Sequence, residues 1–176
     1  MQADLHQFLQ ELGNPAYRHL LINHLPILGL AAGALGLLIA VIMRSRAAQI
    51  PALLVVLVMA ASAFPVYESG EQSYMPVRRI ADADGADWLD AHMDRADTGI
   101  RAFYVLAGVA LVALVVPIKW PRSGTPLAAL PLLGALACLG VGGWIAQAGG
   151  PLLHTALSVS PPPSSDCSTS PTSRPT

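Results

Sequence analysis

The chain has 176 residues, of which 53 % are apolar and only 12 % are charged, whereas ordinary soluble domains are roughly one quarter charged. This composition indicates a lipid environment. The net charge of −1 excludes nucleic acid as a partner, because binding to phosphates needs a concentrated surplus of Lys and Arg.

Four long apolar segments follow a polar N-terminal stretch, which lacks the basic start and apolar core of a cleavable signal peptide. Each is free of charge and has about the 20 residues that a helix needs to cross a ~30 Å hydrocarbon core. The segments are 20–43, 47–67, 102–118 and 126–148. Helices are expected because backbone groups in lipid must be bonded within their own segment. We predict an all-α, four-helix membrane domain over residues 1–157.

The short connections between the apolar segments indicate an orientation. Arg44 and Arg46 stand between the first two segments, Lys119 and Arg122 stand between the last two, and neither connection holds an acid. Because positive loops stay in the cytoplasm, both termini are expected on the outer side of the membrane. The Ser, Thr and Pro-rich tail over 158–176 has little to bury, so it is expected to be disordered.

Small residues recur at close helical spacing in two of the segments. This pattern lets helix backbones approach each other without lipid between them, so we interpret these residues as packing seams. They are Gly29, Gly33 and Gly36 in the first segment and Gly134, Cys138, Gly142 and Ala146 in the fourth.

The long connection over residues 68–101 is expected to be partly helical. Asp87, Asp90, Asp94 and Asp97 recur at the spacing of one helical face, and His92 falls on the opposite, protein-facing side. This pattern predicts that the third helix starts near residue 85 and projects beyond the membrane. The acidic stripe is expected to face water.

Histidines near the helix ends are the candidate functional residues, because ionisable groups are costly in membranes and tend to face the bundle interior. His24, Glu71, His92 and His154 each belong to a different helix and lie at one end of the bundle. A four-helix bundle can hold haem or a metal through inward-pointing side chains. We expect a b-type haem bound among His24, His92 and His154, or a transition metal bound by His24, Glu71 and His92. His19 is interpreted as an ordinary interfacial residue.

Three functions remain open. The first is a redox or ligand-binding module that passes electrons to a quinone or to a membrane or periplasmic protein partner. The second is a non-catalytic membrane subunit that recruits a partner through its acidic outer helix. The third is a proton or ion pathway through His24, Glu71 and His92, which the near-neutral pKa of histidine suits. No catalytic nucleophile is evident, so enzymatic activity stays an open question.

Short motifs at the helix ends carry a family resemblance. They are the segment from Asn23 to Ile27, which contains His24, the pair Gly70-Glu71, the segment from Trp88 to Asp94, and Gly149-Gly150 followed by His154. In these motifs the chain resembles a family of uncharacterised small bacterial four-helix inner-membrane proteins. The resemblance implies a four-helix fold with polar positions at one membrane face. It also implies a bacterial inner membrane, in which both termini would lie on the periplasmic side. Family members carry Arg and Glu beside the last histidine and this chain does not, so the resemblance supports His24, Glu71 and His92 best.

Overall fold

The computed structural model describes residue 6 and residues 10–157, with side chains as far as residue 149, and the described chain is helical with short connections. The helices are α2 (Pro15–Ile22), α3 (Leu25–Ile42), α4 (Arg46–Ala61), α5 (Ala63–Arg78), α6 (Ala83–Lys119) and α7 (Gly124–Leu157), with a 3-10 turn, η1 (Pro121–Ser123), before α7. The predicted all-α class is confirmed. The tail over 158–176 lies outside the described residues.

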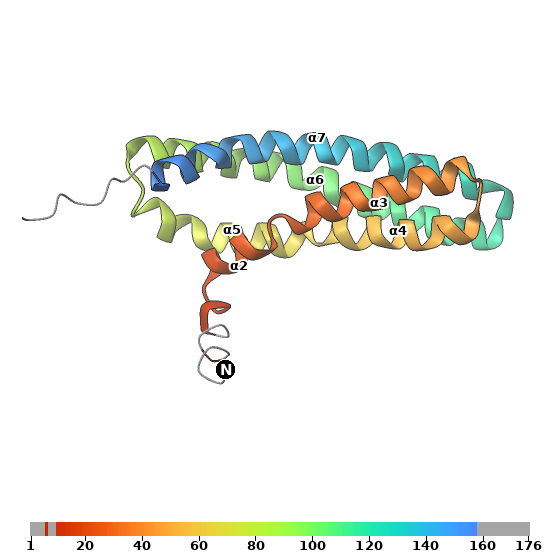
Figure 1. The fold of residues 1–176 in the computed structure, drawn as a ribbon, viewed down its shortest axis with the longest axis horizontal. Helices are drawn as coiled ribbons and strands as arrows, with labels where there is room; N and C mark the ends of the chain where they lie inside the picture. Colours follow the sequence, from red (N-terminus) through yellow and green to blue (C-terminus); the bar gives the residue numbers. More distant parts are fainter. Residues whose placement is uncertain (1–5, 7–9, 158–176) are drawn as a thin grey trace, which may run out of the picture.

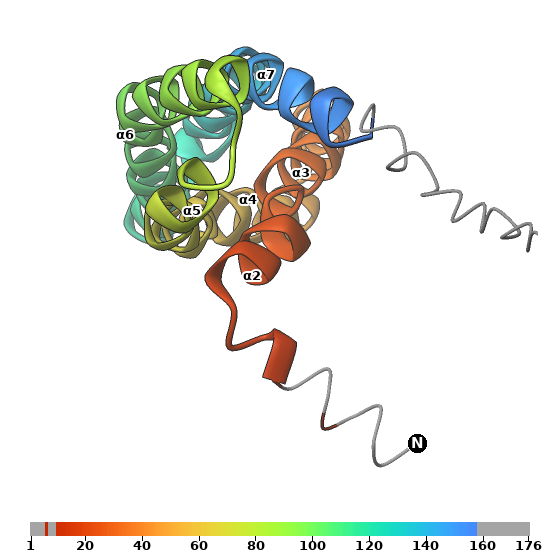
Figure 2. The ribbon, with the colours of Figure 1, turned by 90° about the vertical axis from the view of Figure 1, so that its left-hand side faces the viewer.

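The helices form four rods that run side by side (Figure 1). α2 and α3 make one broken rod, α4 and α5 make a second, and α6 and α7 are the other two. Seen from one end, the rods form a ring in which α6 lies beside α7, α7 beside α3, and α3 beside α4, which returns to α6 (Figure 2). The chain therefore closes a four-rod bundle.

Each rod is long and apolar enough to cross a membrane, as the sequence predicted. These rods cover Pro15–Ile42, Arg46–Arg78, Ala83–Lys119 and Pro121–Gly149. The 37 residues of α6 make a helix of about 55 Å, which exceeds the ~30 Å hydrocarbon core. Its apolar half fits that core, so its charged N-terminal half extends beyond it, beside the end of α5 (Figure 1).

Prolines explain where two of the rods break. Pro26 has no N–H to donate to the carbonyl of Ile22, the last residue of α2. Pro65 likewise has none to donate to the carbonyl of Ala61, the last residue of α4. α6 begins cleanly because the side chain of Asp82 accepts a hydrogen bond from the N–H of Gly85 at 2.8 Å. The helix thus starts at Ala83, close to the predicted start.

Small residues allow the rods to approach each other. A Cβ added to Gly29 would overlap Met59 of α4, and one added to Gly142 would overlap Ile27 of α3. These contacts confirm the predicted seams, although Ala146 is exposed. The fully or almost fully buried core side chains include Leu30, Leu37, Leu53, Val56, Ala110 and Cys138.

The end of the bundle that holds the connections 43–45 and 120–123, here called the basic end, is tied together by one arginine. Arg46 donates through Nη2 to the carbonyls of Ala113 at 3.1 Å and Leu114 at 2.9 Å. The Ala113 carbonyl has no helical donor, because the residue four positions on is Pro117. Arg46 therefore donates the hydrogen bond that Pro117, which has no N–H, cannot.

Candidate histidine site

Two histidines meet at the opposite end of the bundle, which we call the histidine end. His19 comes from α2 and His92 from the charged half of α6. Their ring centroids lie 6.4 Å apart with an angle of 87° between the ring planes. Both side chains are half-buried, so the pair is sheltered without being sealed from solvent.

A backbone carbonyl anchors each ring. Nδ1 of His19 lies 2.9 Å from the carbonyl oxygen of Val66 in α5, and Nδ1 of His92 lies 3.1 Å from that of Ile145 in α7. Because a carbonyl oxygen can only accept, Nδ1 carries the proton in both rings. In the neutral imidazole Nε2 then keeps its lone pair, which is the state that binds a metal.

A glycine makes room for each ring. A Cβ at Gly70 would lie 3.0 Å from Cε1 of His19, and a Cβ at Gly149 would lie 3.3 Å from Nδ1 of His92. Each glycine stands four residues after the carbonyl that its histidine contacts, one helical turn further on. The two histidines thus sit in matching cradles, each made of a carbonyl and a glycine.

Burial keeps His92 neutral. It lies in the charged N-terminal half of α6, outside the uncharged run, and burial there lowers the pKa of His92 from its ordinary value of 6.5. The hydrogen bond to Ile145 opposes this shift, whereas the neighbouring His19 and Arg95 add to it. A neutral His92 at pH 7 follows from the net lowering.

Arg95 fixes α6 against α7 one turn beyond His92. Its Nη1 donates to the carbonyl of Trp144 at 2.8 Å, and the guanidinium carbon lies 5.2 Å from the centroid of the Trp144 ring. The contact is next to the Ile145 carbonyl that holds His92. It therefore stabilises the same stretch of α7 that forms the second cradle.

Acids of the predicted solvent stripe hold α5 against α6. Asp90 accepts from Arg78 Nε and Nη2, both at 2.9 Å, and from the hydroxyl of Tyr74 at 2.6 Å. The hydroxyl of Tyr67 donates to Asp97. Asp87, Asp94 and Asp97 are exposed, as expected for the stripe, whereas Asp90 is only partly exposed. The prediction did not foresee that tyrosines and an arginine of the neighbouring α5 would contact Asp90 and Asp97.

The predicted ligands are distributed differently from the expectation. His24 is exposed at the N-cap of α3, and Glu71 is exposed on α5. His154 lies within the last turns of α7, and its side chain is outside the described residues. Over the described ranges no group of three or more His, Cys, Asp and Glu is placed to hold a metal ion. The structure thus does not assemble His24, Glu71 and His92 as one three-ligand site.

Comparison of the chain with protein-family models, curated proteins and solved structures finds no match. The resemblance to the small bacterial membrane family therefore rests on the short motifs alone. Two glycines of those motifs, Gly70 and Gly149, are the cradle glycines of the histidine pair.

A sequence signal for the pair existed. His19, Pro26, Gly33 and Ala40 follow one another at intervals of seven residues, and the last three are buried. His92, Gly99, Leu106 and Ala113 show the same spacing, again with the last three buried. A seven-residue spacing keeps side chains on one face of a helix, so each histidine continues the core-facing stripe of its rod.

Proposed function

We propose that this protein is a membrane-bound b-type haem protein whose axial ligands are His19 and His92. The observation that carries the proposal is the pair of carbonyl-anchored imidazoles with ring centroids 6.4 Å apart. A centroid separation of 6.4 Å leaves room for one metal ion between the rings, since metal–nitrogen bonds are ~2.0–2.1 Å long.

The donor set favours haem over a bare metal ion. A structural zinc site takes four protein ligands and a catalytic one takes three, and among the described residues no group of three candidate ligands occurs. Haem brings four nitrogens of its own and needs only two axial side chains. Haem held by these two histidines would supply one-electron redox chemistry. The role of this chain would be to hold the two imidazoles in a fixed orientation through their backbone carbonyl partners.

The proposal includes a place in the cell. The connections at the basic end carry Arg44, Arg46, Lys119 and Arg122 without an acid, and positive loops favour the cytoplasm. The histidine end then faces the periplasm of a bacterial inner membrane, together with both termini. Electrons would be exchanged near the outer surface.

The test is an absorption spectrum of the full chain, expressed with added haem and purified in mild detergent. We expect a Soret band and sharpened visible bands after reduction with dithionite. His19→Ala and His92→Ala should each abolish the low-spin spectrum. His24→Ala is the matched control, because that exposed histidine should be dispensable. An absent Soret band, or a loss with His24→Ala alone, contradicts the proposal, and elemental analysis of the same sample would reveal a bare metal.

A second candidate function is partner recruitment by the hairpin of α5 and α6. Met75 and Ile80 are 53 % and 85 % exposed near its tip, and the acids Asp87 and Asp94 are exposed on the same extension. Exposed apolar side chains rimmed by charge are typical of a protein-binding surface. Site-specific photo-crosslinking from position 80 in the host membrane tests this function: one discrete adduct supports it, and a diffuse background contradicts it.

A further inference from the structure

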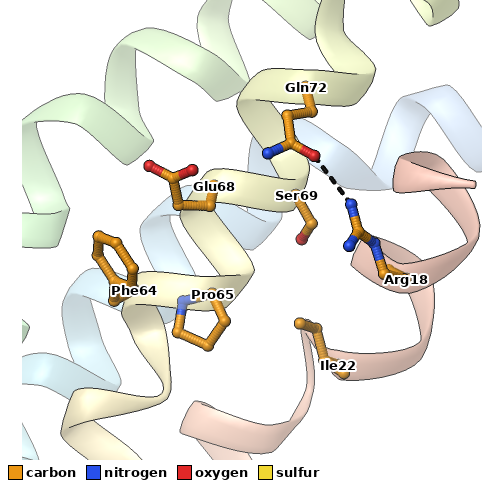
Figure 3. A pocket seen from close by; sticks show the side chains of 7 residues that line it. All are labelled: Arg18, Ile22, Phe64, Pro65, Glu68, Ser69 and Gln72. Atoms are coloured by element: carbon orange, nitrogen blue, oxygen red, sulfur yellow. Dashed lines mark hydrogen bonds between the residues drawn. The ribbon is translucent and has the colours of Figure 1, made fainter. Parts of the chain in front are cut away.

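A cavity of about 270 Å³ lies between α2 and α5 beside the histidine pair. Figure 3 shows that its lining is polar toward one side and apolar toward the other. Gln72, Arg18 and Glu68 form the polar part, and Phe64, Pro65 and Ile22 form the apolar part. We propose that this cavity binds the head ring of a membrane quinone.

The polarity of the cavity follows the direction across the membrane. Phe64 and Pro65 stand at the start of α5, and Gln72 stands two turns further toward the histidine end. Phe64 is 55 % exposed, so the apolar side opens to lipid. An amphiphile would therefore enter from the bilayer with its polar head toward the histidine end and its hydrocarbon tail in the membrane.

The polar groups suit a ring that carries oxygen atoms. Arg18 donates through Nη2 to Oε1 of Gln72 at 2.8 Å, whereas its Nε is shielded and has no partner. A shielded donor of this kind is costly unless a ligand supplies the acceptor. A quinone carbonyl would accept from Arg18, and a quinol hydroxyl could donate to Glu68. The same cavity therefore matches both redox forms.

The charges argue against the most abundant competitor, a phospholipid head group. Arg18 and Glu68 line the same cavity, so its formal charge cancels. A phosphate attracted to the guanidinium would bring its negative charge into a cavity whose lining also includes the carboxylate of Glu68, and like charges repel. A neutral ring with hydrogen-bonding oxygens meets no such opposition.

The cavity shares a residue with the histidine site. Ser69 lines it and is 4 % exposed, and Oγ of Ser69 lies 3.4 Å from Nδ1 of His19. A bound ring would thus lie one side chain away from His19. If the haem proposed above is bound, the ring would be close enough to exchange electrons with it. Oxidation of one quinol to quinone releases two electrons and two protons. The single haem proposed for this chain, if bound, would accept these electrons one at a time and pass each to a one-electron redox partner protein, while Glu68 and then water would take the two protons.

Photo-affinity labelling with an azido-quinone tests binding without relying on haem. The full chain in nanodiscs is irradiated with the probe, and the modified peptide is identified by mass spectrometry. We expect labelling within α2 or α5 that excess short-chain quinone suppresses. In Arg18→Ala the labelling should fall by at least about tenfold, since each lost hydrogen bond to a charged group weakens binding by about 1.5 kcal/mol or more. Arg44→Ala, a cation at the basic end, is the matched control and should label normally.

A second variant tests the ring chemistry itself. Glu68→Gln should weaken competition by quinol more than competition by quinone, because only quinol donates to the carboxylate. Labelling spread over all rods, unchanged by Arg18→Ala, or suppressed better by phosphatidylglycerol than by quinone overturns the proposal. A Soret band without this labelling defeats the quinone site alone, whereas labelling without a Soret band defeats the haem proposal and leaves quinone binding intact.

Discussion

The cradle glycine of His19 offers the sharpest test of the histidine pair. In Gly70→Ala the new Cβ would lie 3.0 Å from Cε1 and 3.1 Å from Nδ1 of His19, closer than the ~3.5–4.0 Å of ordinary carbon contacts. The ring must retreat by about half an ångström, which stretches its 2.9 Å hydrogen bond to Val66. That bond stabilises the fold by about 0.5–1.5 kcal/mol, whereas replacing a helical Gly by Ala gains roughly 0.8–1.0 kcal/mol.

The two effects on folding nearly cancel, so the free energy of unfolding should change by less than about 1 kcal/mol. If the chain binds haem as proposed, its haem affinity should respond much more strongly. The carbonyl partner on Nδ1 orients the ligand ring, and the loss of such partners typically costs roughly 10–100-fold in metal affinity. Gly70→Ala should therefore fold normally but bind haem more weakly, by roughly 10–100-fold.

The assay is a haem titration of purified apoprotein followed by the Soret band, with denaturant unfolding of the same samples. Gly143→Ala is the control, because nothing lies within 4 Å of a Cβ placed there. Wild-type affinity in Gly70→Ala, or an equal loss in Gly143→Ala, would refute the idea that the glycine positions His19.

The remaining predictions concern the charged groups. Burial lowers the pKa of His92, so its titration by NMR should have a midpoint below 6.5, and stability should fall as pH drops below that value because the unfolded state takes up the proton first; a midpoint above 6.5 contradicts this. Arg78 and Tyr74 lower the pKa of Asp90 from 3.8 to about 2, so its contribution is complete above the unfolded value and is lost only as pH falls toward 2. Asp90→Asn should therefore raise hydrogen exchange at the end of α5 already at pH 7, and unchanged exchange would count against the contact. Arg46→Ala leaves the Ala113 carbonyl without a donor and should destabilise the bundle by about 1–2 kcal/mol. Adding Pro117→Ala, which restores a helical N–H, should recover most of that loss in the same unfolding assay, and no recovery would mean that the arginine acts otherwise.

The rods could be predicted because lipid constrains a sequence strongly. An uncharged run must be a helix of a certain length, so 47–67 and 102–118 fall within the second and third rods that the structure shows. The seam glycines followed from the same logic, since only small residues permit close approach. These features depend on one helix and its immediate surroundings.

The histidine site was harder to predict because it depends on contacts between rods. His24 is deeper in the apolar run than His19, yet the break before Pro26 leaves it exposed at a helix start. His92 was placed correctly, since the helical face of α6 alone settles its direction. His19 needed the seven-residue spacing to be followed across that break, and sequence reasoning stopped there.

The contacts of the acidic stripe could not be predicted, for a related reason. Helical spacing identifies the face on which Asp90 and Asp97 lie, but it does not show which side chains of a neighbouring helix reach that face. Tyr67 and Tyr74 are seven residues apart on α5, and the acids that they contact are seven apart on α6. This matching periodicity becomes visible only when the two helices are laid side by side in opposite directions.

The paired cradles have a consequence for how the bundle assembles. One cradle joins α2 to α5, the other joins α6 to α7, and neither contains both imidazoles. A group bound to both histidines would link the N-terminal and C-terminal halves, and its binding free energy would add to the stability of the closed bundle. Without that group the bundle would be less stable, so the unliganded protein would be more open to degradation by quality-control proteases.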